Sequence, residues 1–253
     1  MPVWLNDPAN WTGPNGLLER IGQHLGYSVS AVVVALLIAL PLGLVIGHTG
    51  RGVFLVVGLA NGLRAVPILG LLLLLVVWLS PHLHARLTVP GLIPPGGFAY
   101  IVPIEIALVL LAIPPILSNT YAGVQAVDPA VRDAGEGMGM RGSQVIWQVE
   151  FPCALPLVMS GLRSATLQVI ATATVAAYVP FLGGLGRFIL DGQDQLTNLR
   201  YGYPAMVSAG IVVAVLAVVV DLLLALVQRL VVSRGVAERY RRRRGVRAVP
   251  EPA

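Results

Sequence analysis

Five long runs of apolar residues constrain this chain more than any other feature of its sequence. They lie near Tyr27–Gly47, Leu63–Leu79, Tyr100–Tyr121, Leu162–Leu182 and Pro204–Leu230. A helix needs about 20 mostly apolar residues to cross the hydrocarbon of a bilayer. Charged residues make up 11% of the chain, against about a quarter of a soluble domain, so they cannot cover a water-facing surface. We therefore predict an all-α integral membrane protein with about five transmembrane helices in the lipid bilayer.

The last run contains an acidic residue, Asp221. A central aspartate costs roughly 2.5–3.5 kcal/mol on the insertion scale, and each Leu, Ile or Val returns roughly 0.3–0.6 kcal/mol. The many such residues around Asp221 outweigh its cost. We predict that this helix spans the membrane and that Asp221 faces protein or water rather than lipid.

The arginines indicate how the chain is oriented. A basic tail follows the last run, with Arg229, Arg234, Arg239, Arg241, Arg242, Arg243, Arg244 and Arg247. The positive-inside rule places this tail, residues 231–253, in the cytoplasm, and beside a spanning helix we prefer this to a nucleic-acid site. Counting back through five spans puts residues 1–23 outside and the connection 122–161 inside, where it carries Arg132 and Arg141. The first two dozen residues lack the basic start and apolar stretch of a cleaved signal peptide.

The chain contains no lysine and one cysteine, Cys153. A P-loop nucleotide site requires the lysine of its G-x-x-x-x-G-K-[ST] motif, so a partner must do any ATP-driven work. One cysteine excludes an intrachain disulfide and a metal cluster built on paired thiolates. His82 and His84 lie in a proline-rich connection and offer too few ligands for a metal. We expect no catalytic residue, metal or cofactor in this chain.

The connection 122–161 is polar and rich in glycine, unlike the rest of the chain. Asp128 is a good helix cap and Pro129 suits the first helical position, which predicts a short helix beginning there. Gly137 and Gly139 disfavour its continuation.

This connection is long enough for two short helices that lie against the membrane. In the first, Ala130, Ala134 and Gly135 recur near helical spacing, and their small side chains would allow a partner to approach closely. In the second, Ser143 is predicted to cap a segment that ends near Pro152.

The connection resembles the EAA signature of bacterial ABC importer permeases, written E-A-A-x3-G-x9-I-x-L-P. The matching residues are Asp133, Ala134, Gly135, Gly139, Val149 and Pro152. The spacing is complete, but four residue types differ: Asp replaces Glu, Gly replaces the second Ala, Val replaces Ile and Phe replaces Leu. Glycine at position 135 is the largest departure, because it weakens a helix by about 1 kcal/mol relative to alanine.

The resemblance implies a type I ABC importer permease in the bacterial cytoplasmic (inner) membrane, with residues 24–230 as its transmembrane domain. The loop would form a coupling helix that docks in a groove of a separate ATPase. Asp133 to Gly135 would dock, Gly139 would make the turn and Pro152 would close the motif. Implied partners are two ATPase subunits that use ATP and Mg²⁺, a second permease chain in a homodimer or heterodimer, and an external solute-binding protein.

Further residues resemble the osmoprotectant permeases, which import glycine betaine, choline, carnitine or proline-type solutes. The matching stretches are Thr120–Val124, Val127–Pro129, Gly137–Met140, Gly183–Gly186 and Asp221. Methionine-type permeases share much of this plan, including a match at Asn61–Pro67, so both subfamilies stay open. A gradient-driven secondary transporter is a further alternative, which predicts an internal repeat that the sequence does not show.

Polar residues within the spans are candidates for a translocation pathway. Ser164, Gln168 and Thr172 follow an i, i+4, i+8 pattern and therefore share one face of the fourth span. That face either lines the pathway or allows close helix packing. Glu105, near the outer end of the third span, either attracts a cationic solute or is simply hydrated there. No substrate site is assigned.

Overall fold

The computed structural model describes residues 2–54, 56, 58, 62, 65–83, 97–179, 182–198 and 201–233. Within these ranges every regular element is a helix. Four helices are long and apolar enough to cross a membrane: α2 (Leu17–Thr49), α5 (Phe98–Gln125), a continuous helix over Gly142–Ala176 and α10 (Gly202–Val231). The arginine-rich tail from Arg234 onward, His84, Arg64, Arg86 and Arg200 lie outside the described residues.

Shorter elements connect these helices. They are α1 (Pro2–Leu5), the 3₁₀ helix η1 (Pro8–Asn10), α4 (Ile68–Leu79), the 3₁₀ helix η2 (Ser80–His82), α6 (Pro129–Gly137) and α9 (Gly186–Asp194). The continuous helix consists of α7 (Gly142–Val145), the π-helical turn η3 (Ile146–Glu150) and α8 (Phe151–Ala176).

The first and second predicted spans differ from the observed helices at their starts. Helix α2 begins at Leu17, so part of the expected external segment 1–23 belongs to it. A hydrogen bond of 3.1 Å from Gln23 Nε2 to Glu19 Oε1 supports this polar first part, which hydropathy does not detect. Helix α4 has 12 residues after its cap, Pro67, and is about 18 Å long. This apolar helix occupies the place of the second predicted span.

The predicted second segment of the loop does not end near Pro152. The helix that begins at Gly142 continues to Ala176, so the fourth span starts before Leu162 and ends before Leu182. The π-helical turn explains how the helix passes a proline. The N–H of Phe151 donates to the carbonyl of Ile146, five residues back, and this wider turn accommodates the Pro152 ring and its missing N–H.

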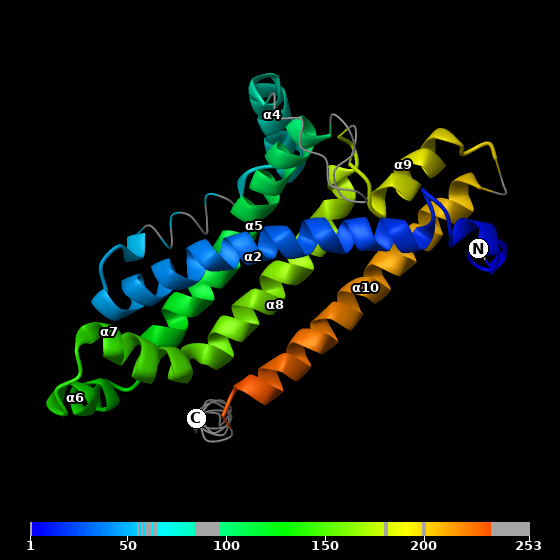
Figure 1. Ribbon diagram of the computed structural model, residues 1–253. Helices are drawn as coiled ribbons and strands as arrows, with labels where there is room; N and C mark the ends of the chain where they lie inside the picture. Colours follow the sequence, from blue (N-terminus) through cyan, green and yellow to red (C-terminus); the bar gives the residue numbers. More distant parts are fainter. Residues whose placement is uncertain are drawn as a thin grey trace, which may run out of the picture.

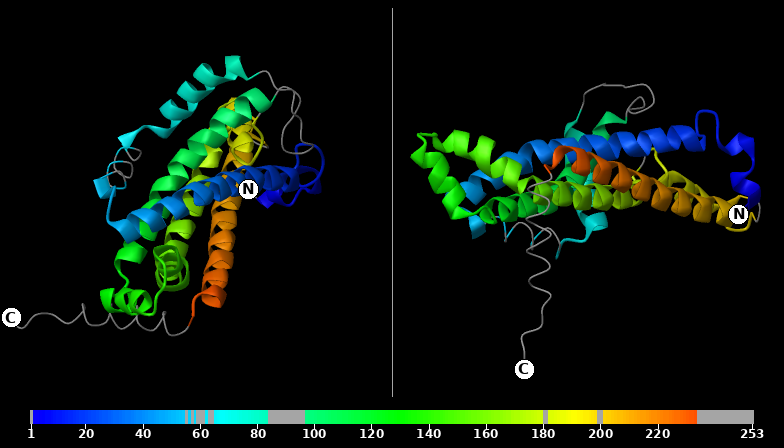
Figure 2. Two further views of the ribbon diagram at one scale, coloured as in Figure 1. Left: turned by 60° about the vertical axis from the view of Figure 1, so that its left-hand side comes forward. Right: turned by 90° about the horizontal axis from the view of Figure 1, so that it is seen from below.

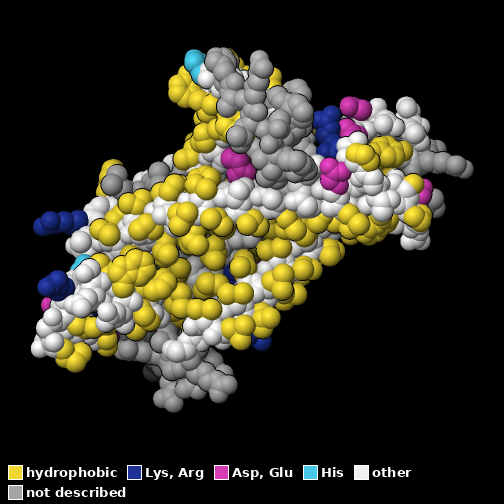
Figure 3. All heavy atoms as spheres, viewed as in Figure 1, with side chains coloured by type: hydrophobic (Ala, Val, Ile, Leu, Met, Phe, Trp, Pro, Cys, Tyr) yellow, Lys and Arg dark blue, Asp and Glu magenta, His cyan; other side chains and the backbone are white. Residues whose placement is uncertain are grey.

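Helices α2, α5 and α8 lie side by side, with α4 against α5 and α10 along α8 (Figures 1 and 2). The amino-terminal segment and α9 pack at the start of α10, at what we call the α9 end. Helices α6 and α7 lie at the opposite end, which we call the α6 end, and α10 runs toward it (Figure 1). Hydrophobic side chains cover the long face between the two ends (Figure 3), as expected of a surface in contact with lipid.

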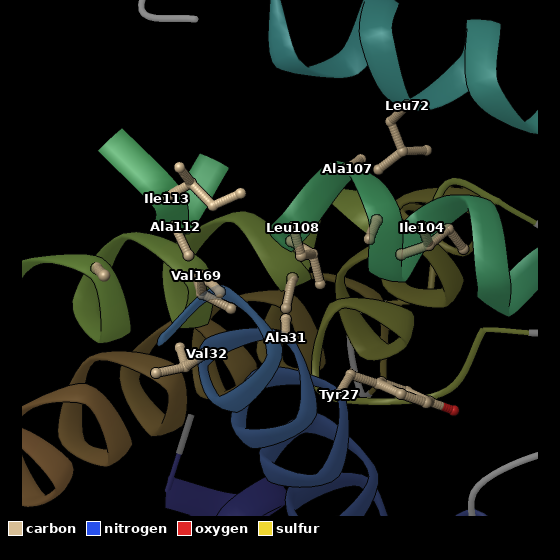
Figure 4. Packing of buried hydrophobic residues seen from close by; sticks show 14 of the residues in the cluster. Tyr27, Ala31, Val32, Leu72, Ile104, Ala107, Leu108, Ala112, Ile113 and Val169 are labelled. Carbon is tan, nitrogen blue, oxygen red and sulfur yellow. The ribbon is translucent and has the colours of Figure 1, made fainter. Parts of the chain in front are cut away.

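Buried apolar side chains fill the space between α2, α5 and α8. Figure 4 shows Tyr27, Ala31 and Val32 of α2 near Ile104, Leu108 and Ala112 of α5 and Val169 of α8. Glycines let the helices approach closely: a Cβ at Gly47 would lie 2.6 Å from Val124 Cβ, and one at Gly161 would lie 2.7 Å from Asn119 Cβ. Gly43 and Gly123 are similarly tight.

An ion pair connects α10 to α8 within their spans. Arg163 Nε and Nη2 lie 2.8 and 2.7 Å from Asp221 Oδ1 and Oδ2, and Arg163 Nη1 also donates to Gln228 Oε1 at 3.4 Å. The prediction that Asp221 faces protein or water is confirmed. A bidentate pair of this kind fixes direction as well as distance.

We predict that Asp221→Asn destabilises the protein by about 1–2 kcal/mol, because it leaves the Arg163 guanidinium without its anion in an apolar surrounding. The melting temperature in mild detergent measures the effect. The double variant Arg163→Met/Asp221→Leu should recover most of the loss, because it leaves neither charge unpaired. An Asp221→Asn variant with the same melting temperature as the natural protein would contradict this role of the ion pair.

Candidate functional site

Helix α6 begins and ends as its sequence predicts. Asp128 Oδ1 accepts a hydrogen bond of 3.2 Å from the N–H of Ala130, and Pro129 occupies the first turn. The helix ends at Gly137, and Gly139 has a φ of +86°. Only glycine adopts this left-handed conformation without steric cost, so Gly139 permits the sharp turn between α6 and α7.

The start of α7 differs from the prediction. Arg141, not Ser143, is the cap residue, and its N–H donates to Gln144 Oε1 at 2.8 Å. Ser143 lies inside the helix. Serine is a favoured cap residue, but the turn at Gly139 lets the chain begin its next helix two residues earlier.

The predicted docking residues divide between two faces of α6. Asp133 and Ala134 are exposed, as are Glu136 and Met138. Gly135 is buried, which contradicts its predicted role in direct docking. A Cβ at Gly135 would lie 3.3 Å from Met140 Sδ, so this glycine allows α6 to pack against the chain that follows it.

The second half of the motif forms the surface against which α6 packs. Val149 is half-buried, with its Cγ2 3.7 Å from the position of a Cβ at Gly135, and Val145 is equally near. Pro152 is exposed in the first turn of α8. The long spacing of the motif therefore brings Gly135 and Val149 together.

A buried acid between the motif residues was missed by the sequence analysis. Glu150 is fully buried, with Oε2 2.9 Å from Nδ1 of His48 and Oε1 2.7 Å from Nε of Arg132. His48 comes from the last turn of α2, and Arg132 from α6. Sequence spacing gives no signal for this cluster, because His48 lies far from Glu150 along the chain. The acid's place directly before Phe151-Pro152 was the only hint.

Two further hydrogen bonds join the helix ends around this cluster. Arg132 Nη2 donates to the carbonyl of Val124 in α5 at 2.5 Å. Gln125 Nε2 donates to the carbonyl of Gly47 in α2 at 2.6 Å. The α6 end is thus a polar junction of α2, α5, α6 and η3, with the exposed face of α6 directed away from it.

The proposed pathway residues of α8 differ in how far they are buried. Ser164 is exposed, Gln168 is half-buried and Thr172 is buried. Thr172 borders a hollow of about 10 Å³ between α4, α5 and α8, which holds no more than about one water molecule. The hollow is therefore not a solute passage in this conformation.

Glu105 has a partner within the protein. It is half-buried in α5 and accepts a hydrogen bond of 3.0 Å from Ser30 Oγ of α2. This contact links the two helices and leaves the second carboxylate oxygen for other interactions. A role in the pathway stays a prediction.

The Gly183–Gly186 stretch forms a tight turn at the α9 end. The N–H of Gly184, whose φ is +84°, donates to Gln23 Oε1 at 2.9 Å. A Cβ at Gly183 would collide with Gln23 Oε1, and one at Gly186 with the carbonyl of Thr174. Glycine is thus required at Gly186, where the collision is with the backbone of α8, whereas a side chain at Gly183 would displace the Gln23 side chain of α2.

Comparison with known protein sequences gives consistent matches. The family described as "Binding-protein-dependent transport system inner membrane component" matches residues 24–233. The glycine betaine/carnitine/choline transport system permease protein OpuCB of Bacillus subtilis is 32% identical, covering 91% of this chain and 96% of that protein. The osmoprotectant import permease protein OsmW of Salmonella typhimurium is 30% identical, covering 85% of this chain and 91% of that protein.

Solved structures share the fold. An inward-facing conformation of the MetNI methionine ABC transporter aligns with a TM-score of 0.65 at 18% identity, over 86% of this chain and 96% of that chain. An amino acid ABC transporter determined with histidines aligns with a TM-score of 0.59 at 19% identity, over 84% and 92%. The predicted fold class is confirmed.

We predict that Gly135→Leu displaces α6 from Val145 and Val149, because the glycine has no space for a large side chain. Gly137→Leu on the same helix is the matched control, since nothing lies within 4 Å of a Cβ there. Hydrogen–deuterium exchange of residues 129–137 measures the effect. Equal exchange in the two variants would show that the buried face of α6 does not hold it in place.

Proposed function

Because this chain belongs to the family of binding-protein-dependent transport system inner membrane components, we propose that it passes a small osmoprotectant across the membrane. The solute is a quaternary ammonium compound such as glycine betaine or choline. The chain is the permease subunit of an ATP-driven importer, and the proposal assigns ATP hydrolysis, with its Mg²⁺, to a separate subunit.

Sequence relatives support this choice of solute over methionine. The relatives named for glycine betaine, carnitine, choline or osmoprotectants are 30% or more identical over most of this chain. The methionine transporter is 18% identical, a level at which the likeness extends to the fold alone. The gradient-driven transporter is not favoured, because both kinds of comparison give ABC importer permeases.

One observation carries the proposed contact with the ATPase. Helix α6 projects from the end of the bundle with Asp133 and Ala134 exposed, while its other face is packed on Val149. A short helix with an acidic and small exposed face fits the groove of a partner. The proposed assembly contains two such ATPases, a second permease chain identical or related to this one, and an external binding protein.

The proposed orientation places the α6 end in the cytoplasm and the amino terminus outside. Arg132 and Arg141 lie at the α6 end, and α10 runs from the α9 end toward it. The amino-terminal segment packs with α9 at the opposite end. With α4 counted as a crossing, this arrangement satisfies the positive-inside rule.

The proposed pathway runs along the exposed stripe of α8 that a second permease chain would face. Ser160 and Ser164 lie on this stripe, and Gln168 borders it. Thr172 and Glu105, which contact other helices of the chain, would join the pathway only after these helices separate. Small hydroxyl side chains suit passage of a quaternary ammonium, because they bind it weakly enough for release.

An uptake assay tests the proposal. The chain is purified with its ATPase and reconstituted in liposomes that contain ATP and Mg²⁺ on the ATPase side, with the binding protein opposite. We expect ATP-dependent accumulation of labelled glycine betaine or choline, and none of labelled methionine. Uptake of methionine without the quaternary ammonium compounds would overturn the assigned solute.

A variant pair places the contact at α6 in the same assay. Gly139→Trp should insert normally but abolish ATPase recruitment and uptake, because the bulky indole blocks close approach beside the docking face. Gly139→Asn should retain both, since asparagine tolerates a positive φ.

A further inference from the structure

We propose that Glu150 is a positioning residue that fastens α6 to the last turn of α2, so that a displacement of α6 moves the spans. The proposal rests on the proposed function, in which the ATPase acts on α6. It concerns the contacts that transmit this displacement from α6 to the spans.

The geometry of Glu150 is that of a two-sided link. One carboxylate oxygen lies 2.9 Å from His48 Nδ1 and the other lies 2.7 Å from Arg132 Nε. His48 belongs to α2 and Arg132 to α6, while Glu150 itself ends the π-helical turn that leads into α8. A single side chain therefore contacts two elements and belongs to a third.

Burial makes this link stiff. Glu150 is 0% exposed, and a carboxylate removed from water is strongly unfavourable unless charged or polar groups pair with it. Each oxygen has a different partner, so separating α6 from α2 strips one oxygen of its partner. The contact with His48 is a hydrogen bond. The contact with Arg132 is a close ion pair without hydrogen-bond geometry, so charge and burial hold it rather than direction.

Arg132 extends the link to α5. Its Nε faces Glu150, while its Nη2 donates to the carbonyl of Val124 near the end of α5. A shift of the α6 backbone thus acts through one guanidinium both on Glu150 and on the end of α5.

Other contacts hold the spans together. The glycine contacts between α2, α5 and α8, and the bond from Gln125 to Gly47, lie outside it. Removing the Glu150 charge should therefore loosen α6 while the bundle stays folded. If Glu150 only filled space in the core, its replacement would instead destabilise α6 and the bundle together.

The first arm of the test measures distance in the purified chain. Spin labels are attached at the exposed positions Arg51→Cys and Glu136→Cys in a Cys153→Ala background. We expect one narrow distance distribution, and a broader and longer one in Glu150→Gln. The control Asp194→Asn, an exposed acid at the α9 end, should leave it narrow. An unchanged distribution in Glu150→Gln would overturn the proposal.

The second arm measures coupling in the reconstituted importer, with glycine betaine as the probe. We expect Glu150→Gln and Arg132→Gln each to raise the ATP hydrolysed per solute imported by about fivefold, at the lower end of coupling factors between distant sites. The double variant should be no worse than either single one, because the two residues act through each other. Losses that only follow the amount of folded protein, or that add in the double variant, would overturn the proposal.

The two arms separate this proposal from the proposed function. If the natural complex neither recruits the ATPase nor takes up solute, the proposed function fails, and the label distances still decide whether Glu150 fastens α6 to α2. If Glu150→Gln does not fold, Arg132→Gln is measured in its place, since it removes the same ion pair from the α6 side.

Discussion

Close contact of α2, α5 and α8 at glycine positions sets the arrangement of the whole bundle. In lipid, no hydrophobic force favours helix association, so packing of small residues has to provide it. Gly43 and Gly47 bring α2 against α5, and Gly123 and Gly161 bring α5 against α8. This contact brings the last turn of α2 near the π-helical turn, where His48 meets Glu150.

The two faces of α6 serve different purposes. Asp133 and Ala134 are exposed to a partner, whereas Gly135 and Arg132 bind the helix to its own chain. A docking helix without contacts to its own chain would move without displacing the spans. A docking helix with both faces buried could not contact a partner. Helix α10 is attached differently, through the ion pair between Arg163 and Asp221.

Much of this could be predicted from the sequence. Hydropathy located α2, α5 and α10, and cap chemistry located the start of α6 at Asp128 and its end before Gly139. The start of the helix over Gly142–Ala176 could not be predicted, because Pro152 indicates an end and the π-helical turn that accommodates it has no sequence signature. The partners of Glu150 were missed, since contacts between distant helices leave no periodic pattern.

In the proposed importer, the exposed face of α6 contacts the ATPase. The most direct measurement places a photo-crosslinking amino acid at Asp133 in the active, purified complex, and a second one at the exposed Tyr203 near the α9 end. We expect a crosslink to the ATPase from position 133 and none from position 203. A crosslink from position 203, or none from position 133 while transport proceeds, would contradict it.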